Sequence, residues 1–577
     1  MRSKQIIFQA LSKKAATIVI IILSSISISL LNIFSTLIVR KLVDNVFTTP
    51  FEQGPNLAFW ITSYIISLLF WFLLELVNKN KAITLGTYVT TSLSKEAYSA
   101  SIRAEIGELQ KFDRDEIVSK ITKDCSKIGN NYIGQTWVTF SRNIIFLVSI
   151  FITMMVLNPV LGLITYVALP LFYMLVKSVE AFLNKFEIKT IKTLEDRERF
   201  IAEDFEKIRS IKLKNGIIKE EEDFIKYNQM YINSQKQYGG LKEVNDYKFF
   251  DLLIGLLFAL IFGVGGYMST RNQPIPGTIV AFVIMIPLIY KTFKELMTLS
   301  ISPSNIQAEI ASIDELLSIK SELKSEPINS LEEVHSLRFQ DVTYYGNENS
   351  IEGLSFELKR GEKLGIVSLD GDSKTIIFEL LTKLIRPKDG VISINNCDIN
   401  KLNTIYLRDI ITAVPQEHCL FNNTIAYNIT YPFPFDEYKY NDALNKSGLK
   451  NILTNYEEKD QTIIDEEHRL SEEMMQRITL ANAFYKDSRI FIFNDATSKL
   501  DARSEEGIMK EVYKLKNKVV IIMSNKTYNI LNCDKVLILD KEQVIEYGKV
   551  QELLENKNSV FSKLIKKVKP SKSARVS

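Results

Sequence analysis

The segment that decides the fold of the second half of the chain is Leu364–Leu384, which reads LGIVSLDGDSKTIIFELLTKL. It begins with an apolar, β-prone run and ends with an apolar helical run that starts at Ile376. The polar loop between the two runs stands where a phosphate-binding loop, G-x-x-x-x-G-K-[ST], would connect a strand to a helix. Backbone amides and the helix N-terminus of such a loop hold phosphate groups. The segment therefore predicts an α/β domain of the P-loop type.

The loop keeps only part of that pattern. Lys374 and Thr375 match its last two positions, whereas Ser368 and Ser373 replace its two glycines. Glycine permits backbone conformations and close approaches that serine resists. The prediction therefore depends on the strand–loop–helix context. The residues that we expect to line a phosphate-bearing ligand are Ser368, Gly371, Asp372, Ser373, Lys374, Thr375 and Ile376.

Short β-prone runs alternate with helical segments on both sides of this loop, which is typical of a domain with a largely parallel sheet. The expected strands are Leu364–Val367, Ile411–Val414, Ile490–Phe493, Val519–Met523 and Lys535–Leu539. We expect this domain over residues 337–565. A helix over Ile301–Lys324 and a polar linker at 325–336 precede it, and a basic tail at 566–577 follows it. The tail is either a solvated end or a contact with a membrane surface.

Further motifs stand around the loop in a fixed order. They are Val342-Thr343-Tyr344-Tyr345, Val414-Pro415-Gln416, Leu470-Ser471-Glu472-Glu473-Met474, Asn494-Asp495 after an apolar strand, and Ser524-Asn525-Lys526. Each motif is weak alone, but their order and spacing resemble the ABC transporter family, in particular exporters that fuse a membrane domain to a nucleotide-binding domain. The resemblance spans nearly the whole chain and implies ATP and Mg²⁺ as cofactors.

The resemblance also implies roles for single residues. Tyr345 would stack on adenine, Thr375 and Gln416 would bind the magnesium ion, and Ser471 belongs to the signature that meets a nucleotide held by the second subunit. Asn494 stands where the family has its metal-supporting aspartate, and Asp495 stands where it has the catalytic glutamate. Asn525 replaces the switch histidine.

These departures predict impaired catalysis. Asp495 is one methylene shorter than glutamate, and neither Asn494 nor Asn525 supplies the expected charge or imidazole. Four carboxylates, on Asp370, Asp372, Glu472 and Glu473, crowd loops that should receive phosphate. One like-charge contact at about 5 Å and an effective dielectric near 20 costs roughly 3 kcal/mol. We expect negligible ATPase activity from a homodimer, and the sequence leaves open whether ATP binds at all.

The first half of the chain carries six apolar stretches that approach or reach the length of about 20 residues needed to cross a bilayer. They are Thr17–Val39, Leu57–Val77, Trp137–Leu157, Val160–Val179, Phe250–Tyr267 and Thr278–Phe293. They predict a transmembrane domain of six helices over residues 1–324. Basic residues precede the first stretch without a nearby cleavage site, which indicates a retained first span with a cytosolic N-terminus.

On this topology the second half of the chain and both termini are cytosolic, and the protein is a multi-pass protein of the cell membrane. The two connections on the inner side, Asn78–Thr136 and Glu180–Phe249, are long and have helical composition. If each folds back as two legs of about 30 residues, it reaches roughly 45 Å below the membrane. We therefore expect helical hairpins that dock on a cytosolic partner at their tips.

Charged residues inside or at the ends of spans are costly unless they snorkel or face a cavity. Glu75 and Lys177 lie close enough to span ends to snorkel. Arg142 and Asp251 also lie near predicted ends, and they either do the same or face a translocation pathway.

Bulk composition excludes some classes of protein. With 71 basic and 68 acidic residues, the net charge of +3 gives no sign of a nucleic-acid partner. The four cysteines and three histidines lack metal-ligand spacing, so a zinc site is not expected.

Two functions remain open. The first is ATP-linked export of a substrate, a peptide or a hydrophobic molecule, by one half of a transporter that pairs with a second half and forms a homo- or heterodimer. The second is a non-hydrolysing membrane protein with a binding, regulatory or immunity role. The six spans favour the first, and the altered nucleotide motifs favour the second.

Overall fold

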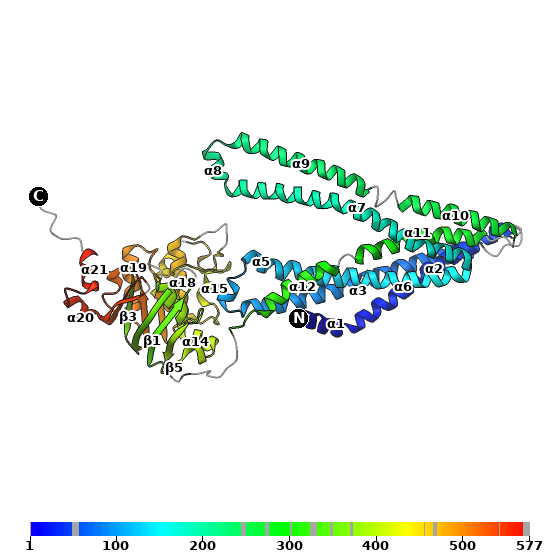
Figure 1. The fold of residues 1–577 in the computed structure, drawn as a ribbon. Helices are drawn as coiled ribbons and strands as arrows, with labels where there is room; N and C mark the ends of the chain where they lie inside the picture. The colour runs from blue at the N-terminus through cyan, green and yellow to red at the C-terminus, as the bar shows by residue number, and fades with distance from the viewer. Residues whose placement is uncertain are drawn as a thin grey trace. The chain divides into compact units, whose positions relative to one another are not determined.

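The computed structural model describes residues 2–48, 57–243, 250–271, 276–300, 303–322, 331, 333–346, 350–369, 373–454, 456–464, 470–541 and 543–568. The chain forms two compact units, and Figure 1 shows their elements in chain order. The helical unit comprises Met1–Tyr98 and Arg114–Ser318. The α/β unit comprises Ser99–Asp113 and Ile319–Ser577.

The helical unit consists of long helices joined by a few short ones. They are α1 (Arg2–Lys13), α2 (Ala15–Thr48), α3 (Leu57–Ile102), α5 (Arg114–Ser119), the π-helical stretches η1 (Lys120–Asp124) and η2 (Lys127–Trp137), α6 (Val138–Leu157), α7 (Pro159–Glu206), α8 (Ile208–Leu213), α9 (Ile217–Glu243), α10 (Phe250–Arg271), α11 (Pro276–Ser300) and α12 (Pro303–Ser318). Among the described residues, six helices are long and apolar enough to cross a membrane. The prediction of six spans is therefore confirmed.

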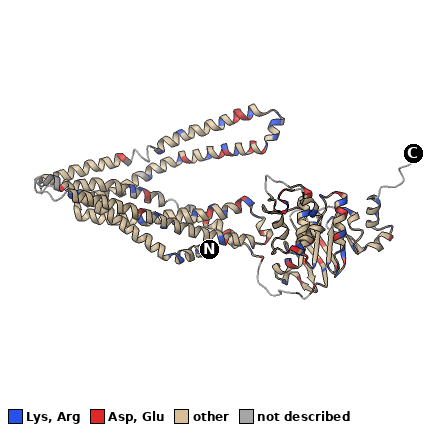
Figure 2. Ribbon diagram, turned by 180° about the vertical axis from the view of Figure 1, so that it is seen from behind, with Lys and Arg blue, Asp and Glu red and all other residues tan. Residues whose placement is uncertain are grey.

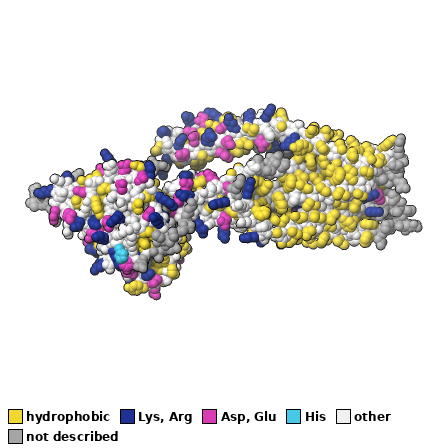
Figure 3. Space-filling view, turned by 60° about the horizontal axis from the view of Figure 1, so that its bottom comes forward, with side chains coloured by type: hydrophobic (Ala, Val, Ile, Leu, Met, Phe, Trp, Pro, Cys, Tyr) yellow, Lys and Arg dark blue, Asp and Glu magenta, His cyan; other side chains and the backbone are white. Residues whose placement is uncertain are grey.

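The core of the helical unit is a contact between apolar helices. On α11, the side chains of Phe282, Met285, Ile286 and Ile289 are fully buried, and their spacing places them on one helix face. The outward faces of the spans are also apolar, as the visible surface in Figure 3 shows. Helices that are apolar on both faces suit a lipid environment.

The turn between α6 and α7 follows from its sequence. The side chain of Asn158 accepts hydrogen bonds from the backbone amides of Val160 and Leu161, at 3.1 Å each, and Pro159 is the first residue of α7. An N-cap asparagine followed by proline is a strong start signal for a helix.

Beyond the apolar spans, α7 and α9 continue as a charged antiparallel hairpin with α8 at its tip (Figure 2). The rings of Phe200 and Tyr227 stack with centroids 4.8 Å apart, and the hydroxyls of Thr193 and Ser234 lie 2.7 Å apart. The helical hairpin that the sequence predicts between the fourth and fifth spans is thus present.

The described residues of the α/β unit form two sheets. A six-stranded sheet has the order β10-β9-β3-β8-β7-β6, in which only β10 runs antiparallel to its neighbour. A four-stranded antiparallel sheet has the order β2-β1-β4-β5. The strands are β1 (Ser336–Tyr345), β2 (Ser350–Lys359), β3 (Lys363–Ser368), β4 (Asp389–Ile394), β5 (Cys397–Asp398), β6 (Ile411–Val414), β7 (Ile490–Asn494), β8 (Val519–Met523), β9 (Lys535–Asp540) and β10 (Gln543–Lys549). All five expected strands and the parallel sheet are confirmed, whereas the antiparallel sheet was not predicted.

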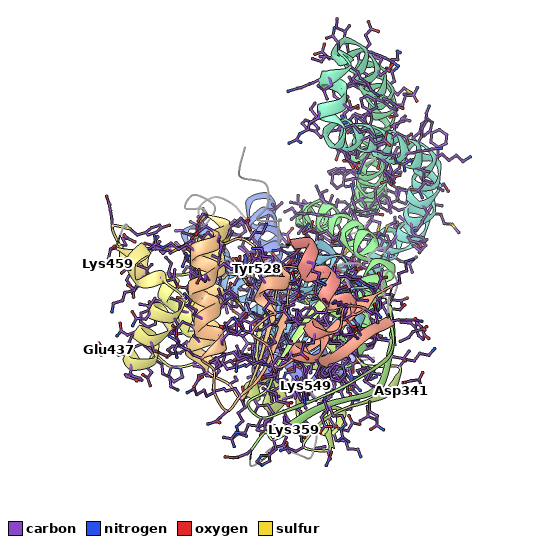
Figure 4. The ribbon with its side chains drawn as sticks, turned by 90° about the vertical axis from the view of Figure 1, so that its left-hand side faces the viewer. Asp341, Lys359, Glu437, Lys459, Tyr528 and Lys549 are labelled. Atoms are coloured by element: carbon purple, nitrogen blue, oxygen red, sulfur yellow. The ribbon has the colours of Figure 1, made fainter. Side chains whose placement is uncertain are left out.

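The α/β unit also contains helices. They are α13 (Ser373–Leu381), α14 (Thr404–Ile410), α15 (Ile425–Thr430), α16 (Glu437–Lys446), α17 (Leu449–Leu453), α18 (Glu472–Lys486), α19 (Ala502–Tyr513), α20 (Val550–Glu555) and α21 (Val560–Val568), with short 3₁₀ turns η4 (Ile399–Lys401), η5 (Lys459–Gln461) and η6 (Thr527–Asn529). Of these, α13, α14, α18 and α20 contact strands of the parallel sheet. Figure 4 places Glu437 and Lys459 in the helical part of the unit and Asp341 and Lys359 on the antiparallel sheet. Strand residues alternate between two hydrophobic cores, since Phe491 belongs to one and Ile490 to the other.

Residues 99–113, with the short helix α4 (Ile106–Leu109), pack within the α/β unit. The backbone amide of Glu105 donates to Lys320, and its carboxylate pairs with Arg386 at 2.8 Å. Because residues 319–322 form these contacts, α12 ends at Ser318 and the helix expected to reach Lys324 is shorter than predicted. Most of the predicted linker lies outside the described residues.

Candidate nucleotide site

The candidate site lies at the carboxyl edge of the parallel sheet, where β3, β8 and β7 are neighbours. In open α/β sheets, ligands bind at this edge. Ser368 ends β3 and is buried, and Ser373 and Lys374 begin α13. Gly371 and Asp372, together with Asp370, lie outside the described residues. Thr375 is exposed on α13, whereas the side chain of Ile376 is buried in the core, so it can offer a ligand only its backbone.

Lys374, on α13, is held by residues that follow two strands of the sheet. Its ammonium donates to Asp495 Oδ2 at 2.6 Å and to Asn525 Oδ1 at 2.8 Å, and its side chain is 1% exposed. Asp495 follows β7 and Asn525 follows β8, so the parallel sheet brings all three residues to one edge. The lysine that the sequence predicts to bind phosphate is thus already paired inside the protein.

Asp495 is itself fixed from several sides. Its backbone has φ of 45°, and its amide donates to Met523 at 2.9 Å. Its carboxylate also accepts the amide of Asn525 at 3.3 Å, and its carbonyl accepts from the side chain of Gln476 at 3.3 Å. Removing one partner from a buried ion pair of this kind costs about 3–5 kcal/mol. The pair is therefore a structural element of the site.

Asn494 is the neutral neighbour of this pair. It is 2% exposed, and its Oδ1 has no hydrogen-bond partner among the described residues. A buried polar atom without a partner is rare in folded proteins and points to a group outside the chain. However, an amide oxygen carries no charge to support a magnesium ion, and the nearby carboxylate of Asp495 is bound to Lys374. The residues at this edge do not fit a hydrolytic magnesium complex.

The signature segment forms the start of α18. Ser471 caps the helix, and its hydroxyl accepts the amide of Met474 at 3.2 Å. Glu473 accepts from Arg477 Nε at 3.0 Å and Nη2 at 2.8 Å, while Glu472 lies 3.8 Å from Lys499. Carboxylates in the first turn neutralise part of the positive charge at the N-terminal end of the helix dipole. This helix start is therefore less suited to a phosphate than one with glycines.

The remaining predicted residues are accessible. Tyr345 is half exposed, its hydroxyl donates to Glu352 at 3.0 Å, and the ammonium of Lys388 lies 4.7 Å from the ring centroid. That cation covers a ring that would have to receive adenine. Gln416 follows β6 with an exposed side chain. Within the described residues, the side chain of Lys374 has hydrogen bonds to Asp495 and Asn525 only, so it does not contact Tyr345, Gln416 or Ser471.

Comparison with known families decides the identity. Residues 18–293 match the ABC transporter transmembrane region, and residues 351–498 match the ABC transporter domain. The chain belongs to the ABC transporter family. Because it carries both domains in one polypeptide, it is a half-transporter of the ABC exporter type.

Relatives of this ABC half-transporter cover most of its length. A putative export ATP-binding/permease protein of Rickettsia bellii is 26% identical over 564 residues, which are 94% of each chain. An ATP-dependent lipid A-core flippase of Desulfotalea psychrophila is 30% identical over 315 residues, 53% of this chain and 54% of that protein. A solved structure of a bacterial Atm1-family ABC exporter with ATP bound has a TM-score of 0.77 at 19% identity, and the match covers 98% of this chain and 99% of the other. That similarity confirms the exporter fold.

Two residues that contact this part of the ABC domain had no role predicted from the sequence. Gln476 is fully buried, donates to the Asp495 carbonyl and accepts the Lys499 amide at 2.9 Å. Glu505 is 2% exposed and accepts hydrogen bonds from Thr497, Lys526, Tyr528 and Asn529. The position of Gln476 just after the signature was the only signal for it, and nothing local marked Glu505.

Proposed function

We propose that the chain is one half of an exporter that works with a second half-transporter, moves a peptide or a hydrophobic molecule out across the cell membrane, and has an impaired ATPase site of its own. The observation that carries the impaired site is the buried pair of Lys374 with Asp495 and Asn525. Both termini and the α/β unit would lie in the cytosol. The domain boundaries that the sequence predicts, and the roles of Tyr345, Gln416 and Ser471, belong to the same proposal.

The ion pair between Lys374 and Asp495 should weaken nucleotide binding. For a triphosphate to reach Lys374, the lysine must leave Asp495, whose carboxylate then faces the phosphate. At about 5 Å and an effective dielectric near 20, that repulsion costs roughly 3 kcal/mol. An energy of this size corresponds to about a hundredfold in affinity. We therefore expect weak binding of ATP and Mg²⁺ at this P-loop.

The same residues argue against hydrolysis. A general base must reach the attacking water to within about 3 Å with a free carboxylate or imidazole. Asp495 is held by Lys374, and Asn525 is an amide that takes no part in proton transfer. Asn494 adds no negative charge for the metal. The site has therefore lost three contributions at once.

A second subunit is the natural source of an active site. In the family each nucleotide lies between the P-loop of one subunit and the signature of the other, so this chain would also present Glu472 and Glu473 to the partner's nucleotide. Arg477 offsets the charge of Glu473, whereas the side chain of Glu472 is 62% exposed. We expect the partner to supply an intact P-loop and catalytic residues that tolerate this surface.

The hairpin tip supports a partner surface. Phe205, Leu213 and Ile218 at the ends of α7, α8 and α9 are 72%, 88% and 73% exposed. Large apolar side chains grouped on a charged hairpin mark a protein contact. Export is supported by the printed names of the relatives, an export permease and a lipid A-core flippase.

The alternative is a non-hydrolysing membrane protein with a binding, regulatory or immunity role, which the buried lysine pair also favours. Purified chain should be assayed for ATPase activity alone and after co-expression with each half-transporter encoded nearby. The proposal predicts activity only in the mixed complex, unchanged by Lys374→Ala in this chain and abolished by the matching substitution in the partner. Turnover by this chain alone that Lys374→Ala abolishes would refute it, and a stable homodimer that ignores ATP would favour the alternative.

A further inference from the structure

A polar cavity lies in the helical unit, whereas the nucleotide site belongs to the α/β unit. Its volume is about 920 Å³, and it is bounded by α3, η2, α6 and α11. Ten of its fifteen lining residues are polar, among them Asn78, Asn130, Asn131 and Gln135. Polar residues that lie at the ends of spans and face a cavity are candidates for a functional site.

The charges of the cavity are already compensated. Arg142 pairs with Glu75 at 2.7 Å, and Lys79 lies 3.8 Å from the same carboxylate. Glu295 accepts a hydrogen bond from Asn143 at 3.0 Å. The lining thus counts two cations, and the carboxylates of Glu75 and Glu295 balance them. A phosphate or carboxylate ligand would have to break an existing ion pair to be neutralised.

The uncharged polar groups of the lining differ from the charged ones, because several of them make no hydrogen bond with other described residues of the protein. The side chains of Asn131, Gln135 and Thr139 have no hydrogen-bond partner among the described residues, and the first two are exposed. A carboxamide offers both donors and an acceptor, as does a hydroxyl in a ligand. These groups suit a neutral ligand that carries several hydroxyls.

An unusual backbone places these carboxamides. Asn130, Asn131 and Gln135 lie on η2, a π-helical stretch of 11 residues, and π-helical turns are rare and frequent at functional sites. The stretch is held close to α3, since a Cβ added at Gly129 would lie 2.1 Å from Thr90 Oγ1 and one at Gly86 would lie 2.8 Å from the Gly129 carbonyl. The cavity wall is therefore built tightly, and its free carboxamides lie on the side that faces the cavity.

Apolar side chains near the cavity indicate that the ligand also has an apolar part. The cavity lies at the inner ends of the second and third apolar stretches, since most of its lining comes from residues 78–136, and the apolar side chain of Ile83 in this lining is exposed. We infer that this cavity binds the uncharged, hydroxyl-rich headgroup of an amphiphile, for example a neutral glycosyl headgroup. This inference deepens the proposed export function by naming the class of substrate. A peptide fits less well, because the lining offers no aromatic side chain and few large apolar ones.

Equilibrium binding without ATP tests the inference. The full chain carries three tryptophans, and Trp137 lies between two lining residues. With Trp60→Phe and Trp71→Phe, the fluorescence of Trp137 reports on the cavity in phosphatidylcholine nanodiscs. The probes are glucosyl diacylglycerol, phosphatidylglycerol with the same acyl chains, free maltose and a neutral decapeptide. We expect saturable binding of the glucosyl lipid. Competition by maltose would mean that the headgroup alone is recognised, and no competition would mean that the lipid form is required.

Substitutions locate the site. Asn131→Ala and Gln135→Ala should each raise the dissociation constant about fivefold, the effect of one lost neutral hydrogen bond. Gln237→Ala, which removes an exposed carboxamide on α9, should leave it unchanged. Equal or tighter binding of phosphatidylglycerol or the peptide, or no effect of both cavity substitutions, would overturn the inference. Because ATP and a second subunit are not needed, such a failure leaves the export proposal intact, whereas normal binding without transport would count against export.

Discussion

The substitution Asp495→Asn separates the two roles that the structure gives to one carboxylate. It keeps the size of the side chain and an oxygen near Lys374, but it removes the charge that holds the lysine at 2.6 Å. Since Lys374 is 1% exposed, the protein would be left with a buried cation whose remaining bonds go to amide oxygens. We expect a loss of stability of up to about 3–5 kcal/mol, the cost of breaking a buried pair.

The same change should strengthen nucleotide binding. It removes a repulsion of roughly 3 kcal/mol between Asp495 and an incoming phosphate and frees Lys374 to pair with it. An increase of about tenfold to a hundredfold in ATP affinity follows. The two effects have opposite signs, so a generally damaged protein cannot produce both.

The assay combines thermal unfolding of the purified chain without nucleotide and equilibrium titration with a fluorescent ATP analogue. Glu506→Gln is the matched control, because Glu506 forms an exposed pair with Lys510 at 2.7 Å that contributes little. Lower thermal stability together with tighter nucleotide binding is the expected result. Unchanged or weaker nucleotide binding in Asp495→Asn would refute the reasoning that this pair blocks the site.

Three further predictions concern other parts of the chain. Burial alone would raise the pKa of Glu505, but hydrogen bonds from Lys526, Asn529, Thr497 and Tyr528 hold the pKa of this carboxyl below its usual value of 4.5. The contribution of Glu505 to the free energy of unfolding should therefore be complete above about pH 4.5 and should fall as the pH drops through the lower pKa of the folded state. The acid unfolding of Glu505→Gln should lack this loss of stability. Gly129→Ala should destabilise the contact between α3 and η2 and lower the unfolding temperature, whereas Gly107→Ala, with no atom within 4 Å of the added Cβ, should not. Lys388→Ala should uncover the Tyr345 ring and raise adenine nucleotide affinity about two- to fivefold, since an exposed cation–π contact contributes about 0.5–1 kcal/mol; adenine-free triphosphate should show no gain.

Elements with a strong local signal could be predicted from the sequence. The six apolar stretches determined six spans because bilayer thickness sets the length of an apolar helix. The strands of the parallel sheet were recognisable because buried parallel strands are continuous apolar runs, as in Val519–Met523. The ends of the helices were harder to predict from the sequence. Helix α12 stops at Ser318 because the following residues pair with residues 103–105, which lie far away in the sequence.

The chemistry of the site needed the tertiary structure. The sequence determined which residues depart from the ABC pattern, since Asn494, Asp495 and Asn525 stand at fixed positions relative to apolar strands. It could not determine that Lys374 is paired with two of them, because that contact joins the start of α13 to residues that lie 121 and 151 positions later in the chain. Nor could it determine that Arg477 offsets Glu473 or that the carboxamides of η2 face a cavity. Local patterns fix where helices and strands form, whereas the pairing of charges depends on which strand ends and helix faces meet in the folded chain.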